Sequence, residues 1–505
     1  MELVRFGFEK MSGQTLQRKF WHRDYLDVSV IWYFKPKEEQ SKEQAMEPIR
    51  IGSRREPMWD DYLIDPERTD TPLRLHHPVQ RDCVPFTEPW AQGVNNAYMC
   101  VLRDGGRYLM YTNCRGGLVC SQSTDGIDWS RPDLGLVEYE GSRHNALVAF
   151  AENEPGAIPH AVCFDGFRAF VDDNPACRPD ERIKAVANVN ERLQLYAGPD
   201  GLRFRHVGTL NIPAQSGTPF DSVNTVFYDG RIGKYRAYVR DYAPPAVQGD
   251  PIWIRSIGTS ESAELFPASG EWPRAQFLRY DTPDLWQMYT NSVMPYERAD
   301  HIFVGFPVRY TLRPVWTDNY DELCGREARL VRAGKDRNDR LGLSLSDTLF
   351  MCSRDGLHFK RFPDAFLRPG PEHPKNWVYG SVYFSNGMFE TAPSHPGCDP
   401  ELSFYCMENR FFPDPPEAWR YTIRLDGFVS RSGVYPESRL TTKPFIFEGR
   451  DLFVNFSTSA YGHLLFTLSD TEGNRITSCE TFGDSTDRRV RFNGSVGDFS
   501  GRPVT

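Results

Sequence analysis

Short runs of apolar residues, many with polar residues at alternating positions, recur along this chain between stretches rich in Gly, Asp and Pro. Runs of this length predict β-strands, because successive side chains of a strand point to opposite faces of a sheet. The clearest set lies at 95–102, 107–111, 117–121 and 134–138. Four strands within about fifty residues form a meander of the size of one propeller blade. The pattern therefore predicts an all-β fold.

A short motif repeats along the chain and predicts that similar sheets follow one another. It consists of a small residue, one spacer, Asp-Gly, two spacers and an aromatic residue, with copies at 123–129, 198–204 and 353–359. Asp-Gly favours a tight turn, because glycine accepts a positive φ and the Asp side chain can bond the backbone two residues on. We expect the aromatic residue to begin the returning strand and to fill the space between neighbouring sheets. Three unrelated hairpins are the alternative.

The repeats predict five units between residues 51 and 428, because the longer gap between the second and third motifs leaves room for one unmarked unit. The expected fold is a five-bladed β-propeller followed by a small β-sandwich over 429–505, where the predicted strands at 445–449, 451–456 and 463–468 are shorter. Residues 1–50 form a third region. In this region 25–34 could be a strand and 35–47 is a polar linker.

Composition and charge narrow the class of protein. The chain has 505 residues and a net charge of −9, which argues against a nucleic-acid or anionic-membrane partner. No apolar run approaches the roughly 20 residues that cross a bilayer, and the N-terminus lacks a signal-peptide pattern. Its 11 cysteines contain no C-x-x-C pair, which indicates free thiols and a cytoplasmic protein without a zinc site. We expect neither a metal nor another cofactor.

Three carboxylates are the candidate catalytic groups. First strands of propeller blades line a central channel, so acids that begin first strands of different blades should meet there. Asp61, Asp221 and Glu297 fit this placement. The segment 57–65 is expected to be a buried strand, on which only one of Asp60 and Asp61 can face the channel. One neutral carboxyl and one carboxylate suit glycoside hydrolysis; a cap or salt bridge is the alternative for each acid.

Other residues near these strand starts are candidates for substrate binding: Asp60, Glu88, Trp90, Asn96, His160, Asn224, Tyr289, Asn291 and Trp377. His144 and His301 could also touch substrate, although a hydrogen-bonded loop histidine is the simpler interpretation. The sequence contains no G-x-S-x-G elbow, no Gly-rich phosphate loop and no H-E-x-x-H motif. These absences argue against the corresponding serine hydrolases, nucleotide-binding enzymes and zinc peptidases.

Three segments carry a resemblance to a known family: Asp60–Ile64, the motif run Ser123–Leu136 and Asp221–Asn224. Over about residues 50 to 500 the chain resembles a bacterial group related to the invertase, fructan-hydrolase and arabinanase glycosidases. The resemblance implies a five-bladed propeller and, as in the invertase branch, a C-terminal β-sandwich. It implies Asp60 or Asp61 as nucleophile and Asp173 or Asp221 as transition-state stabiliser. Glu297 stands in for the family's acid, because its Glu-Cys motif is missing.

These observations predict a glycosidase acting on a furanose-like or otherwise unusual sugar, with a carbohydrate as its partner. A glycoside phosphorylase or transferase on the same fold is a second interpretation, with Arg298, His301 and Arg309 as candidate phosphate ligands. A non-catalytic carbohydrate-binding propeller is the third. The sequence leaves the oligomeric state open, including a homo-oligomer.

Overall fold

The computed structural model describes residues 47–88, 90, 98–114, 116–151, 165–216, 219–244, 253–283, 286–313, 315–334, 340–408 and 417–505. The chain separates into two compact units, Met1–Glu47 and Pro48–Thr505, and the elements below belong to the second. The strand and linker predicted before residue 47 lie outside the described residues. The all-β prediction is confirmed, because the helices in the described part of the chain are short.

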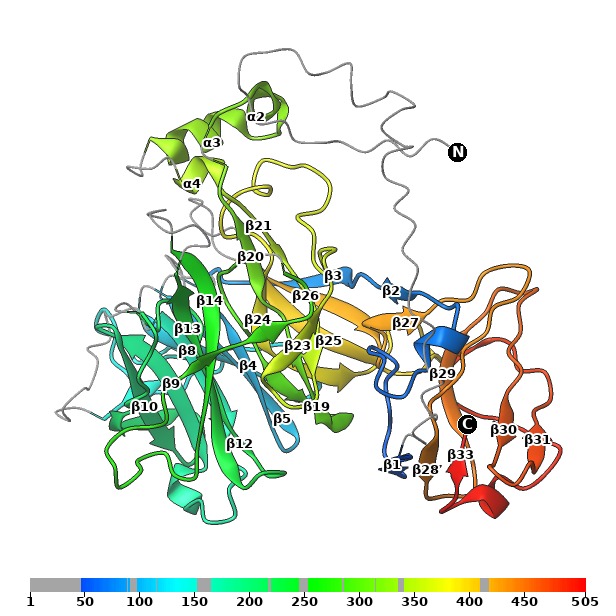
Figure 1. Cartoon of the computed structure of the whole chain (residues 1–505). Coiled ribbons are helices and arrows are strands. Elements are labelled where there is room, and N and C mark those ends of the chain that lie inside the picture. Colours follow the sequence, from blue (N-terminus) through cyan, green and yellow to red (C-terminus); the bar gives the residue numbers. More distant parts are fainter. Residues whose placement is uncertain are drawn as a thin grey trace. The chain divides into compact units, whose positions relative to one another are not determined.

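Most strands belong to antiparallel meanders that follow one another along the chain (Figure 1). The first meander is β4 (Cys100–Asp104), β5 (Arg107–Cys114) and β6 (Gly117–Ser123). The second is β8 (Asp165–Val171), β9 (Ile183–Val189), β10 (Arg192–Gly198) and β11 (Arg203–Thr209), with β7 (Ala149–Phe150) parallel to β11. The third is β12 (Thr225–Asp229), β13 (Lys234–Ala243), β14 (Ile254–Ser262) and β15 (Gln276–Phe277).

Two further meanders complete the series. One is β18 (Met294–Tyr296), β19 (Ala299–Gly305), β22 (Met351–Ser353) and β23 (His358–Arg361), with β16 (Arg279–Tyr280) parallel to β23. The other is β24 (Tyr383–Thr391), β25 (Glu401–Glu408) and β26 (Glu417–Arg424), and its outer strand β3 (Val79–Pro85) comes from the other end of the chain. The last of the five meanders is therefore completed by a strand that precedes the first one in sequence.

The first strands of the meanders, β4, β8, β12, β18 and β24, are called the inner strands here. Each inner strand or its first turn contacts the next, and β24 contacts β4. From β4 to β8 the contact is Cys100 Sγ to Ala169 O at 3.6 Å, and from β8 to the turn before β12 it is Gly166 against Ser222 O. From β12 to the turn before β18 it is Thr225 Oγ1 to Val293 O at 3.2 Å, and from that turn to β24 it is Ser292 Oγ to Phe384 O at 3.4 Å. From β24 to β4 it is the parallel pair Asn386–Cys100. The inner strands therefore succeed one another around a closed ring.

The three Asp-Gly motifs form the same turn, as the sequence predicts. In each motif the Asp Oδ1 accepts hydrogen bonds from the backbone N–H groups two and three residues on. These bonds measure 2.8 and 2.9 Å at Asp125, 2.8 and 3.0 Å at Asp200, and 2.9 and 2.8 Å at Asp355. In the first and third copies the N–H of the Gly also donates to the Oγ of the leading Ser at 2.9 Å.

Each of these turns meets a buried tyrosine of another meander, in what we call the turn–tyrosine contact. The hydroxyl donates to the carbonyl of the motif's Gly, from Tyr405 to Gly126 at 2.8 Å, from Tyr111 to Gly201 at 2.9 Å and from Tyr238 to Gly356 at 2.9 Å. The aromatic residue that ends the motif packs edge-on against the same tyrosine, in the pairs Trp129–Tyr405, Phe204–Tyr111 and Phe359–Tyr238. These residues therefore fill the space between sheets, as predicted.

Gly201 shows why this turn requires glycine. Its φ is +75°, and a Cβ there would lie 2.5 Å from Tyr111 Oη and 2.8 Å from Leu109 Cδ1. A larger residue would therefore be strained in its backbone and would also push the tyrosine away.

A separate three-stranded sheet, whose strands β20 (Val308–Thr311) and β21 (Leu345–Thr348) form a ribbon leading to the helices, extends the fourth meander. β20 pairs with β17 (Gln287–Met288) and with β21. The helices α2 (Asp318–Glu322), α3 (Arg326–Ala333) and α4 (Arg340–Leu343) lie between β20 and β21 in sequence and beyond the end of this ribbon in space (Figure 1). Tyr320 and Leu323 pack with Leu343 to form a small core of their own.

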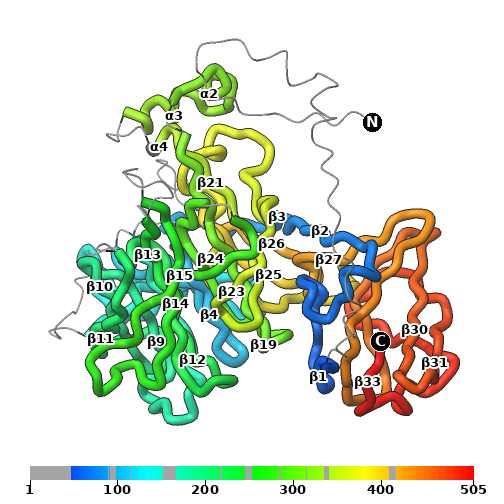
Figure 2. Tube along the Cα trace, in the orientation of Figure 1, coloured from blue at the N-terminus to red at the C-terminus, as the bar shows by residue number. Residues whose placement is uncertain are grey.

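Short strands make up the C-terminal part, and strands from the start of the described chain join them (Figure 2). β28 (Phe445–Phe447) pairs with β1 (Ile49–Gly52) and with β33 (Pro503–Val504), while β27 (Val429–Arg431) pairs with β2 (Leu73–Leu75). The remaining pairs are β29 (Phe453–Ser457) with β32 (Asp484–Arg489) and β30 (Thr467–Ser469) with β31 (Arg475–Thr477). The 3-10 turns are Pro66–Arg68, Pro179–Glu181 and Val496–Phe499.

The segment 57–65 differs from its prediction as a buried strand. It bends, with Tyr62 N–H donating to Asp60 Oδ1 at 3.1 Å, and its only ladder contact is the bridge from Ile64 to Thr442. Trp59 accounts for this path, because its ring lies buried among the rings of Tyr296, Phe350 and Phe428. The apolar residues that suggested a strand therefore anchor a loop to the core.

The turn–tyrosine contacts should contribute measurably to stability. Tyr111→Phe, Tyr238→Phe and Tyr405→Phe each leave a buried Gly carbonyl without its donor, so each should lower the free energy of unfolding by about 1–3 kcal/mol in urea denaturation. Tyr461→Phe is the matched control, because Tyr461 is 84% exposed. Three buried variants as stable as this control would contradict the role assigned to the contact.

Candidate active site

The inner strands run in one direction, so their starts share an edge. Ser222 Oγ donates to Tyr289 O at 2.8 Å, and Thr225 Oγ1 donates to Val293 O at 3.2 Å. Residue numbers rise together in the two segments, so the chain runs in the same direction into β12 and into β18. β24 and β4 also pair in parallel. We call the edge where the inner strands begin the leading edge and the opposite one the trailing edge.

Asp221 lies at the leading edge, in a strained turn just before β12. The residues on either side, Phe220 and Ser222, have φ values of +69° and +84°. Such conformations cost non-glycine residues on the order of 1–3 kcal/mol each and persist where other contacts enforce them. Here Asn224 enforces them: its Nδ2 donates to Phe220 O at 2.9 Å and to Ser222 O at 3.3 Å, and its Oδ1 accepts from Arg240 N at 2.9 Å. Asn224, predicted to bind substrate, is buried and holds the turn that presents Asp221.

Two side chains from β13 contact the carboxylate of Asp221. Arg240 Nη2 lies 3.7 Å from its Oδ2, and the Tyr242 hydroxyl donates to the same oxygen at 3.3 Å. Asp221 is 46% exposed, whereas Arg240 is 1% exposed and donates from Nη1 to Tyr289 O at 2.7 Å. The carboxylate is therefore open to a ligand on one side and held by a fixed cation on the other.

Four buried tyrosines pack beside this group, and we call Tyr289, Tyr310, Tyr379 and Tyr383 the tyrosine cluster. Tyr289 is its centre, with ring centroids 5.7 to 6.0 Å from those of the other three. The Tyr379 hydroxyl donates to that of Tyr289 at 2.6 Å. Arg255 of β14 covers the cluster, with its guanidinium carbon 4.5 Å from the ring centroid of Tyr310.

The leading edge thus combines one half-exposed carboxylate, a phenol hydroxyl, two guanidinium groups and aromatic rings from several sheets. A carboxylate can transfer a proton or attack an electrophilic carbon. Aromatic faces with a few fixed polar groups are typical of small-molecule sites. Among the described residues, no group of three or more His, Cys, Asp or Glu side chains could hold a metal ion.

The other predicted substrate-binding residues lie in varied surroundings. Asn291 is buried and donates to Val223 O at 2.9 Å and to Tyr238 O at 3.2 Å, so it joins the start of the fourth meander to the third. Glu88 accepts from Arg131 Nε at 2.8 Å, and Trp377 donates from Nε1 to Gly370 O at 2.8 Å. The carbonyl of Trp90 accepts from Cys114 Sγ at 2.9 Å. Asn96 and His160 lie outside the described residues.

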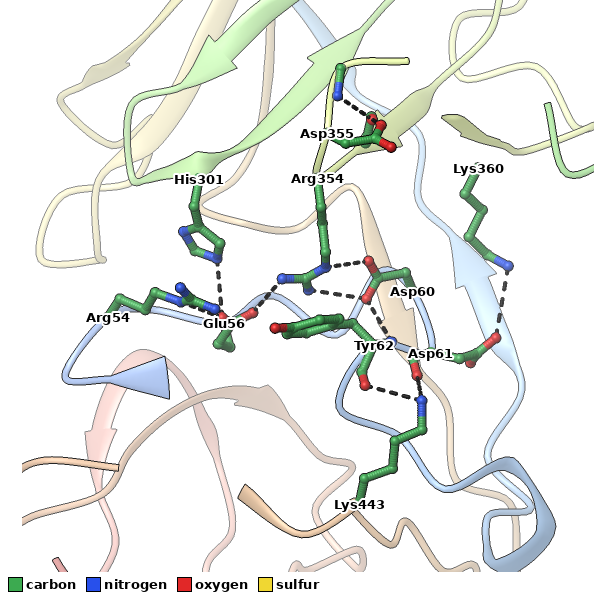
Figure 3. A network of polar contacts seen from close by, with 12 residues as sticks. Arg54, Glu56, Asp60, Asp61, Tyr62, His301, Arg354, Asp355, Lys360 and Lys443 are labelled. Atoms are coloured by element: carbon green, nitrogen blue, oxygen red, sulfur yellow. Dashed lines mark hydrogen bonds and ion pairs between the residues drawn. The ribbon is translucent and has the colours of Figure 1, made fainter. Parts of the chain in front are cut away.

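Asp60 and Asp61 lie among cations from other segments, and Figure 3 shows their side chains facing different partners. Asp60 accepts from Arg354 Nε and Nη2 at 2.7 and 3.1 Å. Asp61 pairs with Arg431 and lies 4.0 Å from Lys360 Nζ. Although burial alone would raise the pKa of Asp61, the hydrogen bond and charge of Arg431 lower it.

Asp60 and Asp61 lie near the trailing edge, as the position of Arg354, the partner of Asp60, shows. Arg354 belongs to the third Asp-Gly motif, which follows β22. β22 is antiparallel to β19, which is antiparallel to β18, so β22 and β18 end on the same side. Asp60 and Asp61 therefore lie on the opposite side of the sheet from the leading edge, where Asp221 is found.

Glu297 directly follows β18 and so lies at the trailing edge. β12 and β18 run in the same direction, and Asp221 precedes β12 whereas Glu297 follows β18, so the two carboxylates lie at opposite edges of these strands. Glu297 lies 3.2 Å from Arg103 Nη1. Loss of solvation raises the pKa of Glu297; Arg103 opposes this, and the carboxylates of Asp173 and Glu390 add to it. The structure does not bring Asp61, Asp221 and Glu297 to one place.

The basic residues suggested as phosphate ligands are all engaged by carboxylates. Arg298 Nε donates to Asp426 Oδ1 at 2.8 Å, and Arg309 Nη2 to Asp347 Oδ2 at 2.6 Å. His301 Nε2 lies 3.2 Å from Glu56 Oε1. The loop histidine His144 lies 3.0 Å from Asp133 and is exposed, as the simpler interpretation expected.

Sequence analysis missed Arg240, Tyr242, Arg255 and three members of the tyrosine cluster. Arg240 and Tyr242 end a strand that the sequence does predict, but they belong to the second strand of a meander, and only first strands were searched for site residues. A signal was present: Arg240, Asp241 and Tyr242 put charge at the end of an apolar strand beside the turn that holds Asp221. Nothing in the sequence indicates that Arg255 joins them.

Comparisons with solved structures find glycoside hydrolases, as the sequence resemblance indicates. The chain is similar to a thermostable family-43 glycoside hydrolase, with 14% identity over 70% of this chain and 99% of that one and a TM-score of 0.38. It is also similar to a fructofuranosidase from Schwanniomyces occidentalis, with 13% identity over 85% of this chain and 86% of that one and a TM-score of 0.34. An α-L-arabinofuranosidase from Podospora anserina matches with 10% identity over 69% of this chain and 98% of that one and a TM-score of 0.36. No family model and no curated protein matches the sequence. At this level of similarity, none of these proteins assigns a reaction to this chain.

The group around Glu56 predicts how stability depends on pH. Burial alone would raise the pKa of Glu56, but His301, Arg354 and Arg54 lower it to about 2 from an ordinary 4.5. The unfolded chain therefore binds more protons between these values, so the stabilisation is complete above about pH 4.5 and is lost as the pH falls towards 2. Glu56→Gln should remove about 2 kcal/mol of the difference in the free energy of unfolding between pH 7 and pH 3, measured by urea denaturation at both pH values. An unchanged difference between the two pH values would contradict the assignment.

Proposed function

We propose that the meanders beginning with β4, β8, β12, β18 and β24 are the blades of a five-bladed β-propeller within 51–428, and that 429–505 forms a small β-sandwich. The closed succession of inner strands supports the propeller. The pairing of β1 with β28 and of β2 with β27 supports a C-terminal part that is completed by strands from before the first blade.

We propose that the protein is a glycosidase whose active site lies at the leading edge of the inner strands. The observation that carries this proposal is the half-exposed carboxylate of Asp221, held by Arg240 and Tyr242 beside buried tyrosines. Its ligand would be a carbohydrate, and the sugar class is the one that the sequence resemblance implies, a furanose-like or otherwise unusual sugar. The non-catalytic interpretation differs in one respect, because it expects binding without turnover.

Asp165 is our candidate for the second carboxylate. It is the first residue of β8, and the Gly166 that follows lies so close to Ser222 that a Cβ would come within 2.1 Å of Ser222 O. The backbone at Gly166 is therefore close to the backbone at Ser222, and the residue before each of them is an aspartate. Asp61 and Glu297 lie at the trailing edge, so neither of them can supply the second carboxylate beside Asp221.

Two such carboxyl groups can divide the work of glycosidic cleavage. In its neutral form one donates its proton to the leaving oxygen as the bond to the anomeric carbon breaks. The other attacks that carbon or takes a proton from the attacking water. Pairs about 5 Å apart retain the anomeric configuration and pairs about 6.5–9.5 Å apart invert it. Glu297 is too far from Asp221 for either arrangement.

The test is a screen of aryl glycosides and oligosaccharides with the purified full-length protein, followed by variants. On a substrate that is turned over, Asp221→Asn and Asp165→Asn should each lower kcat/KM by about 10²- to 10⁴-fold, because each removes an acid or base. Glu297→Gln and Asp61→Asn are the controls and should stay within about ten-fold of the wild type.

Each outcome decides a part of this proposal. Loss of turnover in Glu297→Gln with retention in Asp221→Asn would move the site to the trailing edge. Binding of an oligosaccharide without turnover of any glycoside would support the non-catalytic interpretation instead.

A further inference from the structure

Arg240 and Arg255 have one ion-paired carboxylate between them within the described part of the chain. Arg255 makes no ion pair within the described part of the chain; its Nη1 and its backbone N–H both donate to the neutral amide oxygen of Gln287, at 2.9 and 3.3 Å. Arg240 has one ion pair, the 3.7 Å approach to the half-exposed Asp221. Of the two arginines only Arg240 therefore has an ion-paired carboxylate among the described residues, and that carboxylate is itself open to solvent.

The carboxylate of Asp241 is not a direct partner of either guanidinium group, although Asp241 lies between Arg240 and Tyr242 in sequence. This carboxylate accepts from three backbone N–H groups, those of Gln215, Ser216 and Tyr242, at 2.7, 3.0 and 2.8 Å. These bonds occupy both of its oxygens. The carboxylate of Asp241 therefore leaves the donors of the two arginines free for another acceptor.

One nitrogen of each guanidinium group is buried and has no hydrogen-bond acceptor among the described residues. These atoms are Arg240 Nη2 and Arg255 Nε. Leaving a buried donor of a charged group unpaired costs free energy, so such donors are normally occupied. Arg240 is almost completely buried, and its Nη2 lies 3.7 Å from Oδ2 of the half-exposed Asp221.

Both guanidinium groups are fixed over the same two rings. Their central carbons lie 4.6 and 6.0 Å from the ring centroid of Tyr242, and 5.0 and 5.6 Å from that of Tyr289, for Arg240 and Arg255 respectively. This stacking holds two like charges near each other, which is unfavourable unless an anion is shared between them. The arrangement therefore presents planar donors, already oriented, to a group with several acceptor oxygens.

We propose that Arg240 and Arg255 bind an oxyanion group of the ligand beside Asp221. The shared chemistry is a group with at least two negatively charged or strongly accepting oxygens, either the carboxylate of an acidic sugar or a phosphate. This inference rests on the proposed function for placing a carbohydrate at the leading edge, and adds that the ligand brought there is anionic. It also places any phosphate at these two arginines and away from Arg298, His301 and Arg309, which carboxylates already engage.

The experiment is isothermal titration calorimetry of the full-length protein with inorganic phosphate, with glucuronate and with glucose as the neutral match for glucuronate. We expect at least one of the two anions to bind and glucose to bind at least about ten-fold more weakly. The anion that binds identifies the source of the oxyanion. Arg255→Gln should weaken this binding by about ten-fold or more, because it removes one charged donor group.

Arg309→Gln is the matched control, since it removes an arginine that already has a bidentate carboxylate partner, and it should leave binding within about two-fold. Arg240 is so buried that its removal threatens folding, so Arg255→Gln carries the test, with an unchanged Tm as the check on its fold. The inference is overturned if the wild type binds neither anion, or if Arg255→Gln binds the anion as tightly as the wild type.

Titration of Asp221→Asn separates this inference from the proposed function. That variant keeps both arginines, and binding of phosphate or glucuronate to it supports the anion site even if no glycoside is hydrolysed by the wild type. Hydrolysis of neutral glycosides by a wild type that binds neither anion would overturn the anion site and leave the proposed function standing.

Discussion

The contact on which the architecture depends is the one between an Asp-Gly turn and a buried tyrosine of another meander. It occurs with the same chemistry three times, with a hydroxyl donating to the glycine carbonyl and an aromatic ring edge-on to the phenol. A hydrogen bond fixes distance and direction where hydrophobic burial fixes neither. Three such contacts therefore set how neighbouring sheets meet, and through them where the inner strands lie relative to one another.

The ring of inner strands explains why the chemistry gathers at one edge. Asp221, Arg240, Arg255 and the tyrosine cluster come from three sheets and from segments well separated in sequence, yet all lie where inner strands begin or where the strands beside them turn back. The strained turn around Asp221 costs free energy that Asn224 and Arg240 offset. The trailing edge holds ion pairs such as Asp60 with Arg354, and also Glu297, whose pKa is raised by loss of solvation and by the carboxylates of Asp173 and Glu390. The ion pairs there join separate segments of the chain, whereas the carboxylate of Asp221 at the leading edge is half exposed.

The sequence predicts the all-β fold, the Asp-Gly turns and the place of their aromatic residues, because these depend on local rules of turn geometry and alternation. It fails at 57–65, since an apolar run has the same appearance whether it forms a strand or anchors a loop through a residue such as Trp59. Asp221 was predicted as a site residue because it lies at the start of an apolar run, which is a local property of the sequence. Arg240 and Arg255 were not, because their meeting over Tyr242 and Tyr289 depends on how two strands of one sheet are aligned with the next sheet. Glu297 lies at the trailing edge because it follows β18. The sequence shows that Glu297 is next to an apolar run, but it does not show at which edge of the sheet that run ends.

The central claim is that ligands bind where the inner strands begin. The most direct measurement is a crystal structure of Asp221→Asn with an oligosaccharide or a sugar acid bound. The account predicts electron density against the tyrosine cluster, within hydrogen-bonding distance of residue 221 and of Arg240 or Arg255. Density for the ligand at the opposite edge, in contact with Asp60, Asp61 or Glu297, would contradict it.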